Sequence, residues 1–296
     1  MIKNMVFEGG GVKGIAYVGA LEVFEEQGLL KNVEGFGGTS AGAIMACLCA
    51  LKLPIKKMLD ILWKLDFNAL MDDDWGALRD THRLLHDFGW YKGDYFLQWI
   101  KGIIHAETGM DDLTFYDLHH ITYRDLRVIG ANLSTGYSEV FSYKDTPFLT
   151  VAAAVRISMS IPLFFKAVPM TGGLYVDGGL FRNFPVQLFD EEFLLEETVG
   201  FRLDSTKEIT AFKAGGKVAG DEIVNFKDYI TSLVHAIMNG QEDRHLHSKD
   251  WERTVYIDTG DVSSVDFDLS NEKKQALLKA GRLGAKNYLG LEEGNA

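Results

Sequence analysis

The chain has 296 residues, of which 47% are hydrophobic and 24% are charged, so it is long enough for one large globular domain or two small ones. Its formal net charge of -12 argues against an electrostatically driven nucleic-acid binder, because neutralising phosphates requires a basic surface. The same charge disfavours general attraction to an anionic bilayer. Contact with a membrane would therefore be transient and peripheral, through a local apolar or basic patch.

The two cysteines, Cys47 and Cys49, lie two positions apart in a predicted helix, where their side chains point to different sides and cannot easily bridge. The N-terminus does not show the basic segment and cleavage site of a signal peptide. The longest nearly apolar run, Ala41–Leu51, is far shorter than the roughly 20 residues that span a bilayer. We therefore expect a cytoplasmic protein without a transmembrane segment.

The first fifty residues predict two strand–turn–helix units in succession. Ile2–Phe7 is predicted to be a buried strand, and after a glycine cluster we expect a helix over Ile15–Gln27, ended by Gly28. Val33–Gly38 is predicted to be a second strand, which runs through a sharp turn into a helix over Ala41–Leu51. Successive units of this kind indicate a parallel sheet.

Residues 54–127 are rich in aromatic residues, and we predict that they form a helical insertion without strands that acts as a lid or cap. Beyond it, strands are predicted at Arg127–Leu133, Glu139–Tyr143, Leu174–Val176, Val199–Leu203 and Val255–Ile257, and helices at Pro147–Ser160, Phe226–Asn239 and from the N-cap Ser270 to Leu289. No repeat, low-complexity tract or linker interrupts the chain, so we expect a single domain over residues 1–296.

Gly38-Thr39-Ser40-Ala41-Gly42 matches the pattern G-x-S-x-G between a predicted strand and a predicted helix. In such a turn the serine backbone is strained, its hydroxyl projects from the sheet edge, and glycines two residues before and after it avoid colliding side chains. The N-terminal dipole of the following helix favours developing negative charge. The pattern indicates a nucleophile at Ser40, but the bare pattern is equally compatible with a glycine turn capped by this serine.

The glycine cluster Gly9–Gly14 lies between the first predicted strand and helix. Glycines let successive backbone N–H groups converge on one point, so the cluster can form an oxyanion loop facing Ser40. It also fits the dinucleotide pattern G-x-G-x-x-G, which needs an acidic residue near the end of the second strand, whereas Glu34 lies at that strand's start. A Walker-type phosphate loop is excluded, because Gly14 is followed by Ile15-Ala16.

Lys13 is the only charged residue of the cluster. Three roles stay open for it: it balances an oxyanion, it contacts a lipid phosphate, or it is a solvated lysine at a helix start.

A serine nucleophile needs a base, and the usual order along the chain is serine, acid and a late histidine. The late histidines, His235, His245 and His247, fall in or just after a predicted helix, and they have no obvious partner for a metal site. Asp177, which opens Asp177-Gly178-Gly179 at the end of a predicted strand, is the better candidate, because catalytic groups gather at strand ends in parallel sheets. By itself D-G-G is also a turn signal.

With Gly9–Gly14, Gly38–Gly42 and Asp177–Gly179 in this order, the sequence resembles the patatin-like phospholipase family. Val155–Pro162 is similar to the family's loop between the nucleophile and the aspartate, and the tail from Val265 is similar to the ends of bacterial members. The resemblance implies an α/β fold, a three-layer α/β/α sandwich with a mostly parallel central sheet. It also implies a Ser–Asp dyad without histidine and lipid acyl hydrolase activity.

The resemblance makes Ser40 the nucleophile and Asp177 the base. The roles that it implies for the glycine cluster are an oxyanion hole at the amides of Gly10, Gly11 and Val12, and a basic, substrate-binding position at Lys13. We expect a phospholipid or another acyl lipid as substrate, and neither a cofactor nor a metal. The alternatives are an acyltransferase on the same dyad, a non-catalytic lipid-binding module and a dinucleotide-binding oxidoreductase.

Overall fold

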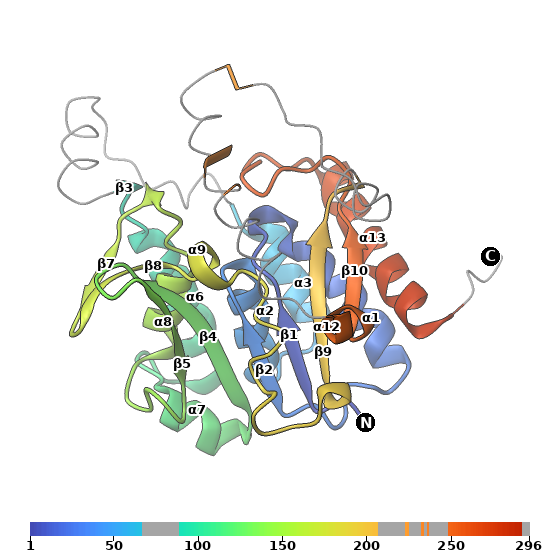
Figure 1. Ribbon diagram of the computed structural model, residues 1–296, viewed down its shortest axis with the longest axis horizontal. Helices are drawn as coiled ribbons and strands as arrows, with labels where there is room; N and C mark the ends of the chain where they lie inside the picture. Colours follow the sequence, from blue (N-terminus) through green and yellow to red (C-terminus); the bar gives the residue numbers. More distant parts are fainter. Residues whose placement is uncertain (67–88, 207–222, 225–231, 234–235, 237–247, 292–296) are drawn as a thin grey trace.

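The computed structural model describes residues 1–66, 89–206, 223–224, 232–233, 236 and 248–291 (Figure 1). Its centre is an eight-stranded sheet of order β10-β9-β1-β2-β4-β8-β7, with β5 paired to β4. Its strands are β1 (Asn4–Phe7), β2 (Gly35–Gly38), β4 (Asp125–Asn132), β5 (Tyr137–Ser142), β7 (Val168–Met170), β8 (Gly173–Asp177), β9 (Thr198–Asp204) and β10 (Thr254–Asp258). The pairs from β10 to β4 are parallel, and those of β5, β8 and β7 are antiparallel. The mostly parallel sheet predicted from the sequence is thus confirmed.

Helices cover the sheet and share one large hydrophobic core with it. They are α1 (Ala16–Glu26), α2 (Ala41–Ala50), α3 (Ile55–Lys64), α6 (Asp94–Thr108), α7 (Phe115–Thr122), α8 (Val151–Ser158), α9 (Gly179–Arg182), α12 (Ser248–Glu252) and α13 (Asn271–Leu289), with 3-10 turns η1 (Gly11–Ile15) and η2 (Leu195–Glu197). Along β1, Met5 and Phe7 face the core with α1, α2 and α13, whereas Val6 faces the smaller cluster that contains Phe189. This alternation is the period of two expected of a strand buried on both faces.

The predicted strands and helices of the first fifty residues are confirmed to within a few residues, and so is the Ser270 cap of α13. The prediction of no strand over residues 54–127 was wrong, because β3 (Gly89–Tyr91) pairs in parallel with β6 (Leu163–Phe165). A strand of three residues shows no usable periodicity, and its partner lies far along the chain. The helix predicted from Pro147 starts only at Val151, where Thr150 caps it.

The predicted cap, residues 54–127, has described parts that pack into the main body. Met58 of α3, Ile100 of α6 and Phe115 of α7 belong to the same buried core as α1 and α2. Residues 67–88 lie outside the described part, as does most of the predicted helix Phe226–Asn239. A capping role for this region stays a prediction.

The two cysteines are both free and buried on α2, so the prediction that they do not bridge is confirmed. Burial raises the pKa of the Cys47 thiol and of the Cys49 thiol to about 12, which keeps both protonated and unreactive. Among the described residues, no helix combines the length and the apolar character needed to cross a bilayer.

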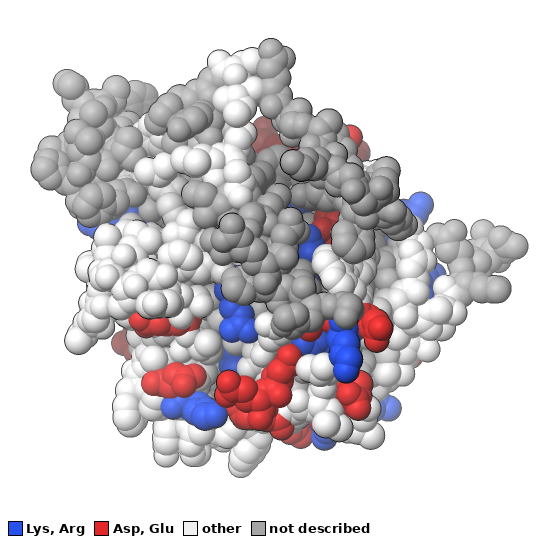
Figure 2. All heavy atoms as spheres, viewed as in Figure 1, with Lys and Arg blue, Asp and Glu red and all other residues white. Residues whose placement is uncertain are grey.

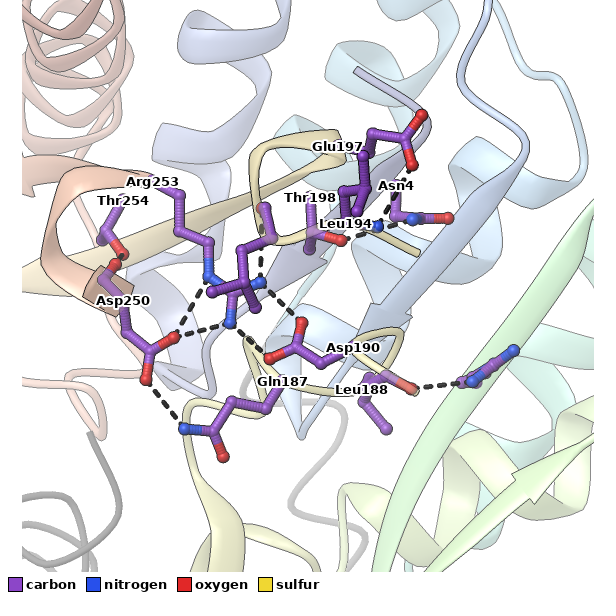
Figure 3. A network of polar contacts seen from close by, with 12 residues as sticks. Asn4, Gln187, Leu188, Asp190, Leu194, Glu197, Thr198, Asp250, Arg253 and Thr254 are labelled. Atoms are coloured by element: carbon purple, nitrogen blue, oxygen red, sulfur yellow. Dashed lines mark hydrogen bonds and ion pairs between the residues drawn. The ribbon is translucent and has the colours of Figure 1, made fainter. Parts of the chain in front are cut away.

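On the face of the sheet that carries α9 and α12, acidic and basic side chains intermingle in a charged patch, and we call this side the polar face (Figure 2). A buried network around Arg253 fastens α12 to the coil before β9 (Figure 3). The Arg253 guanidinium forms a bidentate pair with Asp190, at 2.6 and 2.7 Å, and also binds Asp250 Oδ1 at 2.5 Å. Gln187 donates a hydrogen bond to the other oxygen of Asp250 at 2.7 Å.

Candidate active site

The turn between β2 and α2 holds Ser40 in a strained backbone conformation, with φ 53° and ψ -124°. The flanking glycines are required sterically, as the pattern predicted. A Cβ on Gly38 would lie 2.4 Å from the Gly42 backbone, and one on Gly42 would lie 2.2 Å from the carbonyl oxygen of Phe7. Ser40 thus stands at the N-terminus of α2, whose residues are all buried.

The pairing of strands brings Asp177 to Ser40. One edge of β4 is taken by β5 along Arg127–Asn132, so β2 and β8 share the other edge, β2 along its first half and β8 along its second. Gly38 pairs with Val128 and Asp177 pairs with Gly130, so the residue two positions after Gly38 lies at the level of Asp177. The carboxyl ends of β2 and β8 therefore meet head to head.

This arrangement corrects the reason for choosing Asp177. The sequence argument placed it at the shared carboxyl edge of parallel strands, but β8 runs antiparallel to β4. The aspartate reaches the serine because an antiparallel strand approaches it from the opposite direction.

The Asp177 carboxyl is 2% exposed and incompletely hydrogen-bonded. Its Oδ1 accepts a hydrogen bond from the Gly179 N–H at 2.8 Å, whereas Oδ2 accepts none from the described residues. Burial raises the pKa of Asp177 to about 7, although the Gly179 N–H and the Ser40 hydroxyl act to lower it. An aspartate of this kind carries its proton far closer to neutral pH than an exposed one.

The Ser40 hydroxyl has two neighbours. It interacts with the Asp177 carboxyl, and its Oγ also lies 3.6 Å from Met159 Sδ, an orientation in which the thioether is its acceptor. Thioether sulfur is a weak acceptor, so little holds the hydroxyl in that orientation. A rotation of the hydroxyl toward Oδ2 would satisfy the open carboxylate oxygen.

The glycine cluster runs alongside the elbow. A Cβ on Gly9 would lie 3.2 Å from Ser40 Cβ, and one on Gly14 would lie 3.1 Å from Ala41 Cβ. Gly11 has φ +55°, the left-handed conformation that glycine adopts readily. The cluster is therefore next to the nucleophile, as an oxyanion loop requires.

The three amides predicted to form the oxyanion hole differ in availability. Within the described part of the chain, the N–H groups of Gly10 and Gly11 donate no hydrogen bond, whereas the Val12 N–H donates to the Ser264 carbonyl at 3.1 Å. The segment around Ser264 touches the loop closely, since a Cβ on Gly11 would lie 2.0 Å from the same carbonyl oxygen. Nothing in the sequence signalled this contact.

Lys13 points away from the elbow. Its Nζ donates to the carbonyl oxygen of Leu203, at the end of β9, at 3.2 Å. Its role toward a substrate stays a prediction. The dinucleotide alternative loses its acidic partner, because Glu34 precedes β2 and so lies roughly 13 Å along the strand from the end that meets the glycine cluster.

A small, mostly apolar pocket of about 20 Å³ opens beside Ser40. Its walls come from η1, the start of α2, the end of α3, Met159, Leu269 and Lys274. The volume suffices for about one water molecule, so a larger guest requires flexible side chains such as Met159 to move.

The described histidines do not take part in the site. His105 lies on α6, and His119 and His120 lie on α7, where each bonds a carbonyl oxygen of that region. His235, His245 and His247 lie outside the described residues. No group of three metal-binding side chains occurs in the part of the chain that the structure describes.

Comparison with known proteins decides the family. The family model for patatin-like phospholipase matches residues 5–190, a range that contains the glycine cluster, the elbow and Asp177. The chain belongs to the patatin-like phospholipase family. The resemblance inferred from the ordered motifs is thus confirmed.

Relatives of this patatin-like protein include the uncharacterized protein YqhO of Bacillus subtilis, which is 31% identical over 96% of this chain and 97% of its own length. A probable lipid hydrolase, 463L, of Invertebrate iridescent virus 6 is 23% identical over 63% of this chain and 62% of its own length. The crystal structure of VipD from Legionella pneumophila has a TM-score of 0.65 at 18% identity, over 98% of this chain and 67% of that one. This likeness confirms the α/β fold class.

Proposed function

We propose that this patatin-like protein hydrolyses carboxylic esters of lipids, with Ser40 as nucleophile and Asp177 as general base. The observation that carries the proposal is the pairing of a strained serine with a buried carboxyl whose pKa is about 7. Membership of the patatin-like phospholipase family and the relative named as a probable lipid hydrolase support the substrate class.

The first half of the reaction forms an acyl-enzyme. Asp177 Oδ2 accepts the proton of Ser40 as Oγ attacks the ester carbonyl, and the carbonyl oxygen becomes negatively charged. The aspartic acid then returns the proton to the departing alcohol as the carbon–oxygen bond breaks. In the second half, water loses a proton to the same carboxylate and attacks the acyl carbon. Asp177 then returns that proton to Ser40 Oγ as the acyl–oxygen bond breaks, which releases the fatty acid and restores the Ser40 hydroxyl.

A pKa near 7 suits Asp177 to both roles. A base works best when its pKa lies near the working pH, because it is then deprotonated often enough to accept a proton and acidic enough to return it. The burial that raises the pKa also excludes water, which strengthens electrostatic interactions inside the site.

The amides of Gly10 and Gly11 are the donors that we assign to the negative oxygen, assisted by the N-terminus of α2. The Val12 amide becomes a third donor only if it leaves the Ser264 carbonyl. Lys13, which binds Leu203, would stabilise the loop rather than touch the substrate in this arrangement.

The acyl chain of the substrate would enter the pocket beside Ser40, whose apolar walls match a hydrocarbon. Because the volume is about 20 Å³, entry requires side chains to move aside. Contact with a membrane surface would be transient, since the lipid must leave the bilayer to reach a buried serine.

The test is hydrolysis of a p-nitrophenyl fatty ester and of a mixed phospholipid extract, with the released fatty acids identified by mass spectrometry. We expect Ser40→Ala to abolish turnover and labelling by a fluorophosphonate, while Ser142→Ala, a buried serine on β5, keeps both. Turnover that persists in Ser40→Ala would exclude the mechanism. Adding an alcohol acceptor distinguishes hydrolysis from acyl transfer, because only transfer yields a new ester.

A further inference from the structure

We propose that Ser158 is a positioning residue for the nucleophile, and that the turn at the end of α8, residues 158–160, sets the separation of Ser40 and Asp177. The inference rests on the proposed function and extends it to the segment that packs against the backbone of Ser40 and Asp177. Three contacts to Ser40 and Asp177 carry it, and each comes from one of these three consecutive residues.

The first contact holds the backbone of the nucleophile. The backbone N–H of Ser40 donates a hydrogen bond to Ser158 Oγ at 2.9 Å, and both residues are buried. The first amides of a helix have no partner inside the helix, so this bond satisfies a donor that would otherwise be buried alone. It also occupies the Ser40 amide, which leaves the glycine cluster to bind the oxyanion.

The second contact fixes the base. The backbone N–H of Asp177 donates to the carbonyl oxygen of Ser160 at 2.9 Å. Met159, between the two serines, supplies the sulfur that lies 3.6 Å from Ser40 Oγ. One turn of chain therefore contacts the backbone of both reacting residues and the hydroxyl of one.

The turn itself is held rigidly. Ser160 Oγ donates to the carbonyl oxygen of Arg156 at 2.8 Å and accepts a hydrogen bond from the Arg156 guanidinium. The same guanidinium donates to the carbonyl oxygens of Lys92 and Gly93, at 2.6 and 2.9 Å, before α6. Gly93 has no room for a side chain here, since a Cβ would lie 2.2 Å from Arg156 Nη2.

Contacts of this kind should affect the rate of the chemical step rather than the binding of substrate. Ser158 lines no wall of the pocket, so its loss should leave substrate affinity unchanged. Ser40 is strained, and without its hydrogen bond the elbow can relax; displacements of about 1 Å in an active site lower rates by about 10²-fold. The pKa of Asp177 comes from its burial, which the Ser158 hydroxyl does not provide.

The experiment compares Ser158→Ala with Ser142→Ala, the same substitution at another fully buried serine. Ser142 is the last residue of β5, and its hydroxyl donates a hydrogen bond to the Asp145 carboxylate. We expect Ser158→Ala to lower kcat and the rate of fluorophosphonate labelling about 10- to 100-fold, with KM within twofold of wild type. The midpoint of the pH–rate profile should not move while its plateau falls. Ser142→Ala should lose thermal stability but keep kcat.

Ser158→Cys has nearly the same volume and a weak acceptor, so its kcat should fall between those of wild type and Ser158→Ala. If Ser158→Ala is insoluble, the ratio of kcat in Ser158→Cys to kcat in Ser142→Ala tests the inference instead. A kcat in either variant equal to that of Ser142→Ala overturns the inference. A wild-type protein that is not labelled at Ser40 overturns the proposed function instead, whatever the Ser158 variants do.

Discussion

Two buried aspartates in this protein are satisfied in opposite ways. Asp250, on the polar face, is bound through one oxygen to Arg253 and through the other to Gln187 (Figure 3). Asp177 accepts one N–H at Oδ1, and its Oδ2 has no hydrogen bond among the described residues. A buried charge that is fully paired stabilises one arrangement of the chain, whereas an open buried oxygen is available to a moving proton.

The pKa values of Arg253 and Asp177 show the same difference. Burial alone would lower the pKa of Arg253, but hydrogen bonds to Asp190 and Asp250 raise it. At Asp177 burial dominates, and the pKa rises to about 7. Substitutions at the two places should therefore have different signatures.

The largest effect is expected for Asp177→Asn. It removes the base but keeps the shape of the side chain and an acceptor for Gly179, so kcat should fall about 10²- to 10⁴-fold. Circular dichroism and thermal unfolding should show a folded protein. Steady-state kinetics with a p-nitrophenyl ester measure the loss, and unchanged kcat would remove Asp177 from the mechanism.

Arg253→Met should show the reverse pattern. Removing the guanidinium deprives the neighbouring carboxylates of Asp190 and Asp250 of their shared cation, so the free energy of unfolding should drop by about 3–5 kcal/mol. Activity per folded molecule should stay near that of wild type at a temperature where the variant is folded. Urea denaturation and an active-site titration separate the two quantities, and lost activity with unchanged stability would contradict the comparison.

The pH dependence gives a third test, with opposite signs for rate and stability. Deprotonation of Asp177 is needed for attack, so kcat/KM should rise with pH through about 7. Between about pH 4 and 7 the folded state holds this proton and the unfolded state does not, so Asp177 lowers stability as pH rises, by at most about 1.4 kcal/mol per unit. Asp177→Asn should lack this term, so its stability relative to wild type should increase over the same range.

The smallest effect concerns strain at the elbow. Ser40→Gly and Ser40→Ala both lack the hydroxyl, but only glycine adopts φ 53° and ψ -124° without strain. The glycine variant should therefore be the more stable of the two by about 1 kcal/mol, after its larger entropy in the unfolded state is counted. Chemical denaturation measures the difference, and a more stable alanine variant would show that the elbow stores no strain.

The local parts of the fold could be predicted from the amino-acid sequence. The strand–turn–helix units of the first fifty residues, the elbow at Ser40 and the glycine cluster follow from apolar periodicity and from glycines at fixed spacing, which are local properties of the chain. The order of three motifs was enough to assign the family, because each motif restricts the backbone within a few residues. Val155–Pro162 was also singled out by its resemblance, although the roles of Ser158 and Ser160 were not foreseen.

How these parts come together depends on long-range packing that the sequence does not reveal. The position of Asp177 depends on β8 running antiparallel along the edge of β4 that β2 leaves open, and the state of the Val12 amide depends on a carbonyl at Ser264. Contacts between residues so distant in the chain are set by packing of the whole core and leave no pattern in either segment. For the same reason a bare aspartate in a D-G-G turn cannot reveal its raised pKa, which arises from the burial that the complete fold imposes.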